Sequence, residues 1–143
     1  MHPAATFRVA EKAEALAFIA AHPFATLAVN GADGPVTALV PLVIDSSGQD
    51  LLGHVARTNP FWQSAQMSER KAVAVFQGAD AYVSSSNYPS KADHGRVVPT
   101  WNYMAVEIRG DITVEMKSEA MLPFRADSCR ARSVKLLMWM ASV

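Results

Sequence analysis

The sequence predicts a small, mainly β protein of the α+β class, an antiparallel barrel with flanking helices. Roughly five to seven short strand-like runs follow one another at regular spacing. The first three, at residues 24–30, 35–45 and 51–56, are joined by turns too short for crossover helices, which argues against a parallel sheet. A chain of 143 residues suits one domain with its own core.

The N-terminal third predicts one helix and a hairpin. The alanine-rich stretch at about 9–21 has apolar residues at helical spacing and ends before Pro23. The sequence GADG at 31–34 is typical of a turn between two strands. Pro41 lies inside the second strand, so we expect either an edge strand or a bulge there.

A second helix is predicted within residues 57–71, directly after the third strand. Asn59 is its expected N-cap, and Pro60 suits the first helical position. The side chains expected to face the core are Phe61, Ala65 and Met67.

Later strands are predicted at 72–78, at 81–86 as a fifth strand or a continuation of the fourth, and at 100–116 with a break at Gly110-Asp111. Residues 117–143 show no clear strand pattern, are locally basic and end in the apolar run LLMWM. A helix is the closest assignment for this tail.

Composition weighs against several classes of protein. The formal net charge is zero, so the chain lacks the basic footprint of a nucleic-acid-binding domain. The single cysteine, Cys129, forms no intramolecular disulfide and has no ligand partner at zinc-site spacing. No apolar run approaches the ~20 residues that span a bilayer, and the N-terminus does not resemble a signal peptide. We therefore expect a cytoplasmic protein without a metal site.

Two stretches carry candidate binding residues, and the first is LLGHVARTNP at 51–60. His54, Arg57 and Asn59 lie where a strand gives way to a helix start, and such donors beside helix N–H groups can bind a phosphate. A surface turn with a capping asparagine and a solvated arginine is the alternative, and composition alone favours it. No HExxH, nucleophile elbow, GxGxxG or Walker motif is present, so no catalytic residue is assigned.

The second stretch is YPSKADHGRVVPTWNY at 88–103. Its basic side chains, Lys91, His94 and Arg96, suit an anion.

Alternation along the strand that follows places Trp101 and Tyr103 on one face. Thr100 and Asn102 lie on the other. A planar heteroaromatic ligand with a phosphate tail needs flat apolar surface, polar groups and basic groups together. A core tryptophan and tyrosine explain the pattern equally well. Single-stranded nucleic acid would also suit aromatic and basic groups, but the neutral charge weighs against it.

The chain resembles the PaiB-type negative transcriptional regulators, an FMN-binding family, in four motifs that occur in order within residues 5–115. The motifs are AHPFATL (21–27), LLGHVARTNPFW (51–62), AVFQGADAYVSSSNYPSK (74–91) and VVPTWNYMAVEIRG (97–110). The resemblance implies a split β-barrel of the FMN-binding, pyridoxamine-phosphate-oxidase-like type, forming a homodimer with FMN at the subunit interface.

The resemblance also implies roles for particular residues. Strand 37–41 would offer backbone groups to the isoalloxazine edge. The residues implied to contact the phosphate or ribityl chain are His54, Arg57, Asn59 and Lys91. Those implied to lie near the flavin or the dimer seam are Thr100, Trp101 and Asn102.

The resemblance fades after about residue 115, whereas family members run on well beyond that point. We therefore expect an FMN-binding domain at 1–116 and a divergent tail at 117–143, of the kind that a shortened or frame-shifted coding end would produce. Loss of late strands would expose a sheet edge and weaken flavin binding and dimerisation.

Three functions remain open. The first is a regulatory FMN-binding protein, for which direct DNA binding is not supported by the charge or by a helix-turn-helix motif. The second is an FMN-dependent oxidoreductase acting on a small molecule. The third is a family member that no longer binds flavin.

Overall fold

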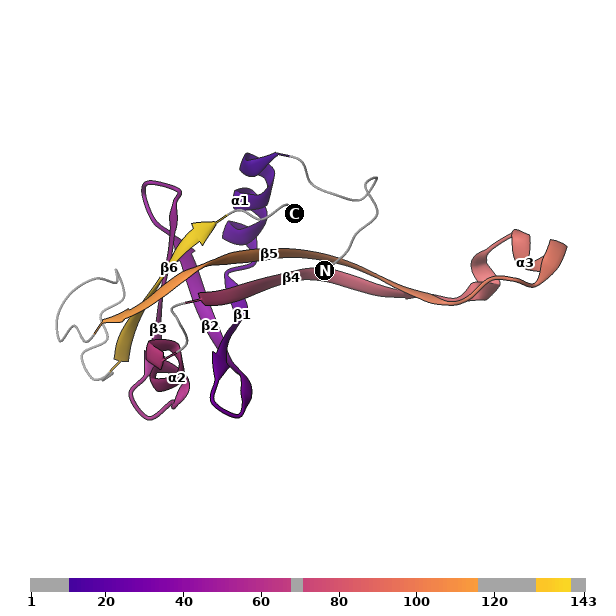
Figure 1. The fold of residues 1–143 in the computed structure, drawn as a ribbon. Coiled ribbons are helices and arrows are strands. Elements are labelled where there is room, and N and C mark those ends of the chain that lie inside the picture. Colours follow the sequence, from indigo (N-terminus) through magenta and orange to yellow (C-terminus); the bar gives the residue numbers. More distant parts are fainter. Residues whose placement is uncertain (1–10, 68–70, 116–130, 140–143) are drawn as a thin grey trace.

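The computed structural model describes residues 11–67, 71–115 and 131–139, and strands make up most of these residues (Figure 1). The strands are β1 (Phe24–Gly31), β2 (Gly34–Ile44), β3 (Asp50–Ala56), β4 (Lys71–Val83), β5 (Thr100–Glu115) and β6 (Ala131–Trp139). The helices are α1 (Lys12–Ala21), α2 (Phe61–Met67) and α3 (Ser90–His94), with a 3-10 turn, η2, at Ser85–Asn87.

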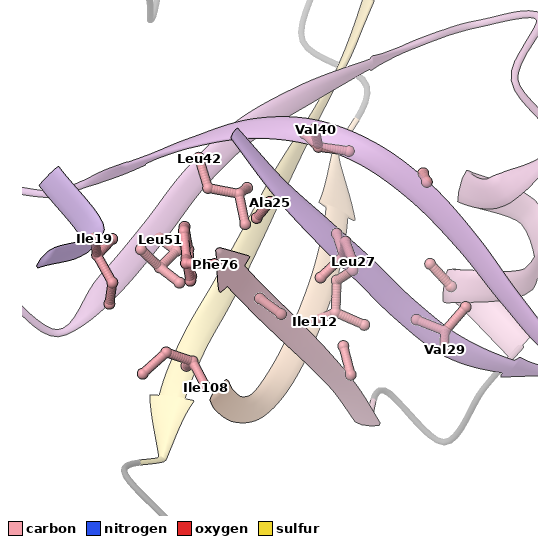
Figure 2. Close-up of a cluster of buried hydrophobic side chains, with 14 of the residues drawn as sticks. Ile19, Ala25, Leu27, Val29, Val40, Leu42, Leu51, Phe76, Ile108 and Ile112 are labelled. Atoms are coloured by element: carbon pink, nitrogen blue, oxygen red, sulfur yellow. The ribbon is translucent and has the colours of Figure 1, made fainter. Parts of the chain in front are cut away.

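The six strands form a closed antiparallel barrel in the order β1-β2-β3-β6-β5-β4, with β4 pairing back onto β1. Side chains alternate between the interior and the outside, as β1 shows with buried Ala25, Leu27 and Val29. The interior is filled by aliphatic residues and Phe76 (Figure 2). The predicted antiparallel barrel is therefore confirmed.

Two of the helices bury side chains against the barrel core. Ala15 and Ile19 of α1 are buried, and the helix predicted at 9–21 is confirmed from residue 12, since residues 9 and 10 lie outside the described part. α2 buries Phe61 and Ala65, as expected. Met67 was expected to face the core, but it lies at the end of α2 and is 73% exposed, so that prediction is wrong.

Pro41 lies in an interior strand of the barrel, so the prediction of an edge strand is wrong. β1 pairs over its whole length with residues 34–41 of β2, including Phe24 opposite Pro41, and no register shift interrupts this pairing. Leu42 donates its backbone N–H toward β1, to the carbonyl of Pro23, so the nitrogen of Pro41 faces β3. The ladder to β3 begins only at Leu42, and the missing N–H of proline therefore costs no ladder bond.

β4 and β5 are longer than the sequence predicted, and their outer halves leave the barrel as a two-stranded ribbon. The run at 81–86 continues β4 to Val83, and β5 passes through Gly110 without the expected break. A bulge between Gln77 and Asp80 shifts the register where the ribbon leaves the barrel. We call residues 78–104 the arm; it includes η2 and α3 at its far end (Figure 1).

The helix prediction for the C-terminal tail is wrong over residues 131–139. This segment is strand β6, which pairs with β3 on one side and β5 on the other and so closes the barrel. The pattern of a short continuous apolar run does not distinguish a strand from a helix. Here the segment is a strand because it pairs with the edges of β3 and β5. The rest of the tail, 116–130 and 140–143, lies outside the described residues.

Candidate functional site

His54 lies on the outward side of β3 and is half-buried. Its neighbours Gly53 and Val55 face the interior, and Gly53 pairs with Leu42. A Cβ at Gly53 would lie 2.8 Å from the carbonyl oxygen of Pro41, so glycine permits the close approach of β2.

Arg57 and Asn59 follow β3 directly and connect it to α2. Arg57 is exposed, and its backbone carbonyl accepts a hydrogen bond of 3.0 Å from Trp62 Nε1. Asn59 Oδ1 accepts a hydrogen bond of 3.0 Å from the backbone N–H of Phe61, which confirms the predicted N-cap. We call His54, Arg57 and Asn59 the barrel group.

The cap changes what the barrel group can offer to an anion. The amide of Phe61 is already bonded to Asn59, and α2 has only seven residues. The free helix N–H groups expected beside this strand end are therefore not the main donors. The guanidinium of Arg57 and the imidazole of His54 are the donors best suited to a phosphate.

An apolar surface borders the barrel group on the outside of β1 and β2. Phe24 is 60% exposed, Leu39 65% and Val43 49%. Phe24 pairs with Pro41. The next residue, Leu42, pairs with Gly53, the residue before His54, so this surface extends along the sheet to His54. We call Phe24, Leu39, Pro41 and Val43 the outer face.

Aromatic side chains lie together on one side of the arm. The rings of Tyr82 and Trp101 are cross-strand partners with centroids 5.9 Å apart and planes inclined by 47°. Trp101 and Tyr103 are 57% and 58% exposed, so the alternative that they are core residues is wrong. Thr100 and Asn102 occupy the alternate positions of β5, where they pair with Val83 and Ala81.

Lys91 lies at the far end of the arm, in α3. Its Nζ donates to the hydroxyl oxygens of Ser85 at 3.2 Å and Ser86 at 3.3 Å. His94 Nδ1 accepts the backbone N–H of Arg96 at 3.1 Å, which folds the end of the loop back on itself. The result is an exposed, cation-bearing tip.

The structure divides the expected site residues into two groups that lie far apart within one chain. The barrel group lies at the junction of β3 and α2, whereas the other four residues lie on the arm, which projects away from the barrel (Figure 1). The residues on the arm are Lys91, Thr100, Trp101 and Asn102.

Sequence reasoning did not single out a groove on the outside of β1, β4 and β5. It encloses about 350 Å³, and its floor includes Ala28 and Val73. Lys71 and Arg109 rim it, the first paired with Asp111 and the second with Glu107. Alternate charges along 107–111 are the signal for this rim, but they are equally typical of a solvated strand.

Two further features are absent from the described part of the chain. Its side chains include no group of three or more histidines, cysteines or carboxylates that could hold a metal ion. Within the same residues, no helix is long and apolar enough to cross a membrane.

The described fold is a closed antiparallel barrel that carries cationic donors beside an apolar face, and comparison identifies its family. The family described as "Putative FMN-binding domain" matches residues 1–130, and the chain belongs to it. The match extends beyond residue 115, where the resemblance in sequence was expected to fade.

Two curated relatives support the assignment. The chain is 31% identical over 115 residues to "Protease synthase and sporulation protein PAI 2" of Bacillus subtilis, covering 79% of this chain and 53% of the relative. It is 34% identical over 82 residues to the uncharacterized protein YKL070W of Saccharomyces cerevisiae, covering 54% and 47%. The chain thus spans about half the length of the curated relatives it matches. The resemblance to the PaiB family is confirmed.

Solved structures confirm the fold. The flavocytochrome Anf3 of Azotobacter vinelandii has a TM-score of 0.66 at 11% identity, over 96% of this chain and 69% of that one. A Listeria innocua structure named "Putative Pyridoxamine 5'-phosphate oxidase" has a TM-score of 0.58 at 11% identity, over 92% and 97%. Identities this low show the fold alone, which is the expected split-barrel type.

Proposed function

We propose that this chain is a regulatory FMN-binding protein that holds the flavin at a homodimer interface. The observation that carries the proposal is the barrel group, an arginine and a half-buried histidine beside an exposed apolar face, in a chain of an FMN-binding family. A cytoplasmic location is part of the proposal, and the single cysteine is consistent with it.

The residues present fit FMN. A phosphate needs cationic donors, which Arg57 and His54 supply at the end of β3. A flavin ring needs flat apolar surface with a few polar groups, and the outer face and the aromatic side of the arm both offer it. When bound, the flavin supplies electron- and hydride-transfer chemistry, while the chain's residues bind and orient it.

A regulatory role without direct DNA contact fits the charge and the helices. The formal net charge is zero. In the described part of the chain, α1, α2 and α3 are separated from one another by strands, so they form no helix-turn-helix. Regulation would then act through the bound flavin or through a protein partner.

A flavin-dependent oxidoreductase is the second candidate, and the structural relatives favour it. One is named a flavocytochrome and another an oxidase. The two candidates share the FMN site and differ in whether a second substrate exchanges electrons with the flavin. Reduction of bound FMN by NADH or NADPH, followed by reoxidation with repeated turnover, would establish the enzyme.

Titration with FMN tests the shared site. We expect the flavin spectrum to change on binding and the melting temperature to rise with FMN concentration. Arg57→Ala should weaken binding about tenfold or more, because it removes a charged hydrogen bond to the phosphate. Lys12→Ala, which removes an exposed cation on α1, is the matched control and should leave the affinity unchanged.

Failure of the wild-type chain to bind FMN well above micromolar concentration, with no rise in melting temperature, would contradict the proposal. The chain would then be a family member that no longer binds flavin.

A further inference from the structure

We propose that the groove on the outside of β1, β4 and β5 binds a small monocarboxylate with a compact apolar body, held through the guanidinium of Arg109. The groove shares no residue with the barrel group, the outer face or the arm. It is therefore a second ligand site, separate from the proposed FMN site.

The groove is hollow because two short side chains lie side by side on the outer surface of the sheet. Ala28 of β1 and Val73 of β4 are cross-strand partners that face outward. The groove above them encloses about 350 Å³. This volume lies at the lower end of the roughly 300–1,000 Å³ of ordinary small-molecule sites, so it suits a compact ligand.

The residues beside this apolar floor differ between its two sides. Pro35 of β2 and Asn30 of β1, which pair with each other, line the side next to β2. Lys71 of β4 and Arg109 of β5 line the side next to β5. A ligand with an apolar body and a charged end matches this lining, because the body covers the floor and the charge lies at the cations.

Arg109 determines the chemical class of the charged end. Its side chain is 60% exposed, and its Nε donates to Oε1 of Glu107 at 2.8 Å. Among the described residues this is the only hydrogen bond of the guanidinium, so Nη1 and Nη2 stay available as donors. Two parallel N–H groups of one guanidinium fit the two oxygens of one carboxylate.

The charges beside the groove favour a monoanion over a phosphate. The cations Lys71 and Arg109 are balanced by the carboxylates of Asp111 and Glu107, which pair with them at 2.5 Å and 2.8 Å. A phosphate dianion would bring a second negative charge close to these carboxylates, and like charges repel. A carboxylate brings one charge, which the free nitrogens of Arg109 can hold.

Benzoate is the probe, because it joins one carboxylate to a compact apolar ring. In nuclear magnetic resonance spectra of the labelled chain, the backbone amides of Ala28, Val73 and Arg109 should shift with benzoate concentration and give a Kd of about a millimolar or lower. Benzamide has the same shape without the charge and should bind about tenfold more weakly. Inorganic phosphate at equal ionic strength should leave these amides unshifted.

Two substitutions at Arg109 separate its charge from its geometry. Arg109→Ala should weaken benzoate binding about tenfold or more, because it removes the paired donors. Arg109→Lys keeps the charge but not the two parallel donors, so its affinity should fall between those of Arg109→Ala and the wild type. Lys12→Ala, which removes an exposed cation on α1, is the control and should bind benzoate as the wild type does. Melting temperatures should be nearly unchanged, because a surface ion pair contributes little to stability.

Val73→Phe tests the hollow itself. The larger ring would fill the floor of the groove and leave every charged residue in place, so benzoate binding should be lost. Gln77→Phe adds the same ring at an outward position of β4 beyond the groove, and it should bind benzoate normally.

Several results would overturn the site. One is the absence of amide shifts at benzoate concentrations well above the millimolar range, as expected if a second copy of the chain covered the groove. Equal shifts with phosphate would indicate an adventitious ion only. Wild-type affinity in Arg109→Ala or in Val73→Phe would place the benzoate elsewhere.

Competition with FMN distinguishes this site from the proposed function. Displacement of benzoate by FMN would show that the groove belongs to the flavin site and would overturn the second site. Binding of both ligands together supports two separate sites. A chain that binds benzoate in the groove but no FMN contradicts the proposed function alone.

Discussion

Asp45 shows how a single carboxylate can hold a turn. Its oxygens accept hydrogen bonds from Ser47 Oγ at 2.7 Å and from the backbone N–H groups of Asp50 at 3.0 Å and Gln49 at 3.1 Å. These bonds, that of Ser47 first, lower the pKa of Asp45 from 3.8 to about 2. The ionised side chain of Asp45 therefore stabilises the turn between β2 and β3.

The lowered pKa predicts a defined pH dependence. The contribution of Asp45 is complete above the unfolded-state pKa near 3.8 and is lost as the pH falls through about 2. Asp45→Asn should thus melt below the wild type at neutral pH, with the gap narrowing between pH 4 and pH 2. Asp33→Asn, in the turn between β1 and β2, is the control. A gap of equal size at pH 2 and pH 6 would contradict this role.

Asn59 allows the cap and the flavin contact to be measured separately. Asn59→Ala should lower the free energy of unfolding by about 1 kcal/mol, because the N–H of Phe61 loses its acceptor. Asn59→Asp keeps a capping oxygen and should fold nearly as stably, but its added charge beside Arg57 should weaken FMN binding. Urea denaturation and FMN titration of both variants check this. Equal FMN affinity in Asn59→Asp and the wild type would place the phosphate elsewhere.

At the scale of elements, glycine governs how closely helices and strands approach. A Cβ at Gly78, at the base of the arm, would lie 2.9 Å from Cζ of Phe18 and 3.2 Å from Nε2 of His22. The centroids of these two rings lie 4.5 Å apart at the end of α1, with the ring planes inclined by 48°. The end of α1 is thereby packed against the point where the arm leaves the barrel.

Two alanine substitutions should rank in a definite order. Gly53→Ala would meet a backbone oxygen at 2.8 Å, whereas Gly78→Ala would meet side chains that can shift with the end of α1. We expect Gly53→Ala to cost more, with both within about 1–3 kcal/mol of unfolding free energy. Urea denaturation measures both. The reverse order would mean that α1 is held more rigidly than β2.

Local pattern predicted most elements, but not their extent. The hairpin turn at 31–34, the Asn59 cap and the buried Phe61 follow from neighbouring residues alone, and all are found. The expected break at Gly110 is absent because this glycine faces the barrel interior within β5. Gly110 lies in a strand because of its tertiary packing, and this packing cannot be predicted from a short window of sequence.

For the whole molecule, the family motifs predicted the split barrel and its FMN-binding family, which the comparisons confirm. The contacts of individual residues with flavin stay predictions. The separation of Lys91 from Arg57 could not be foreseen, because it depends on the direction in which β4 and β5 leave the barrel. The closing strand was missed because its apolar run does not alternate and because one of its partners, β3, is distant in sequence.

Closure of the barrel predicts the effect of shortening the chain. Ending it after Arg130 removes β6 and exposes the edges of β3 and β5, so we expect a lower melting temperature and aggregation. Ending it after Trp139 keeps β6 and is the control. Light scattering during a thermal ramp compares the two. A soluble, equally stable chain without β6 would contradict the closed barrel.

The late position of β6 in the chain also sets an order of events during synthesis. β1, β2 and β3 can pair as neighbouring hairpins soon after they are made. In contrast, Asp50 of β3 can pair with Leu137 of β6 only after residue 137 has been synthesised. Through that interval two strand edges stay open, and nascent chains are then most prone to pair with one another. Pulse-labelled hydrogen exchange during refolding should therefore find the amides of β1 and β2 protected before those of β6.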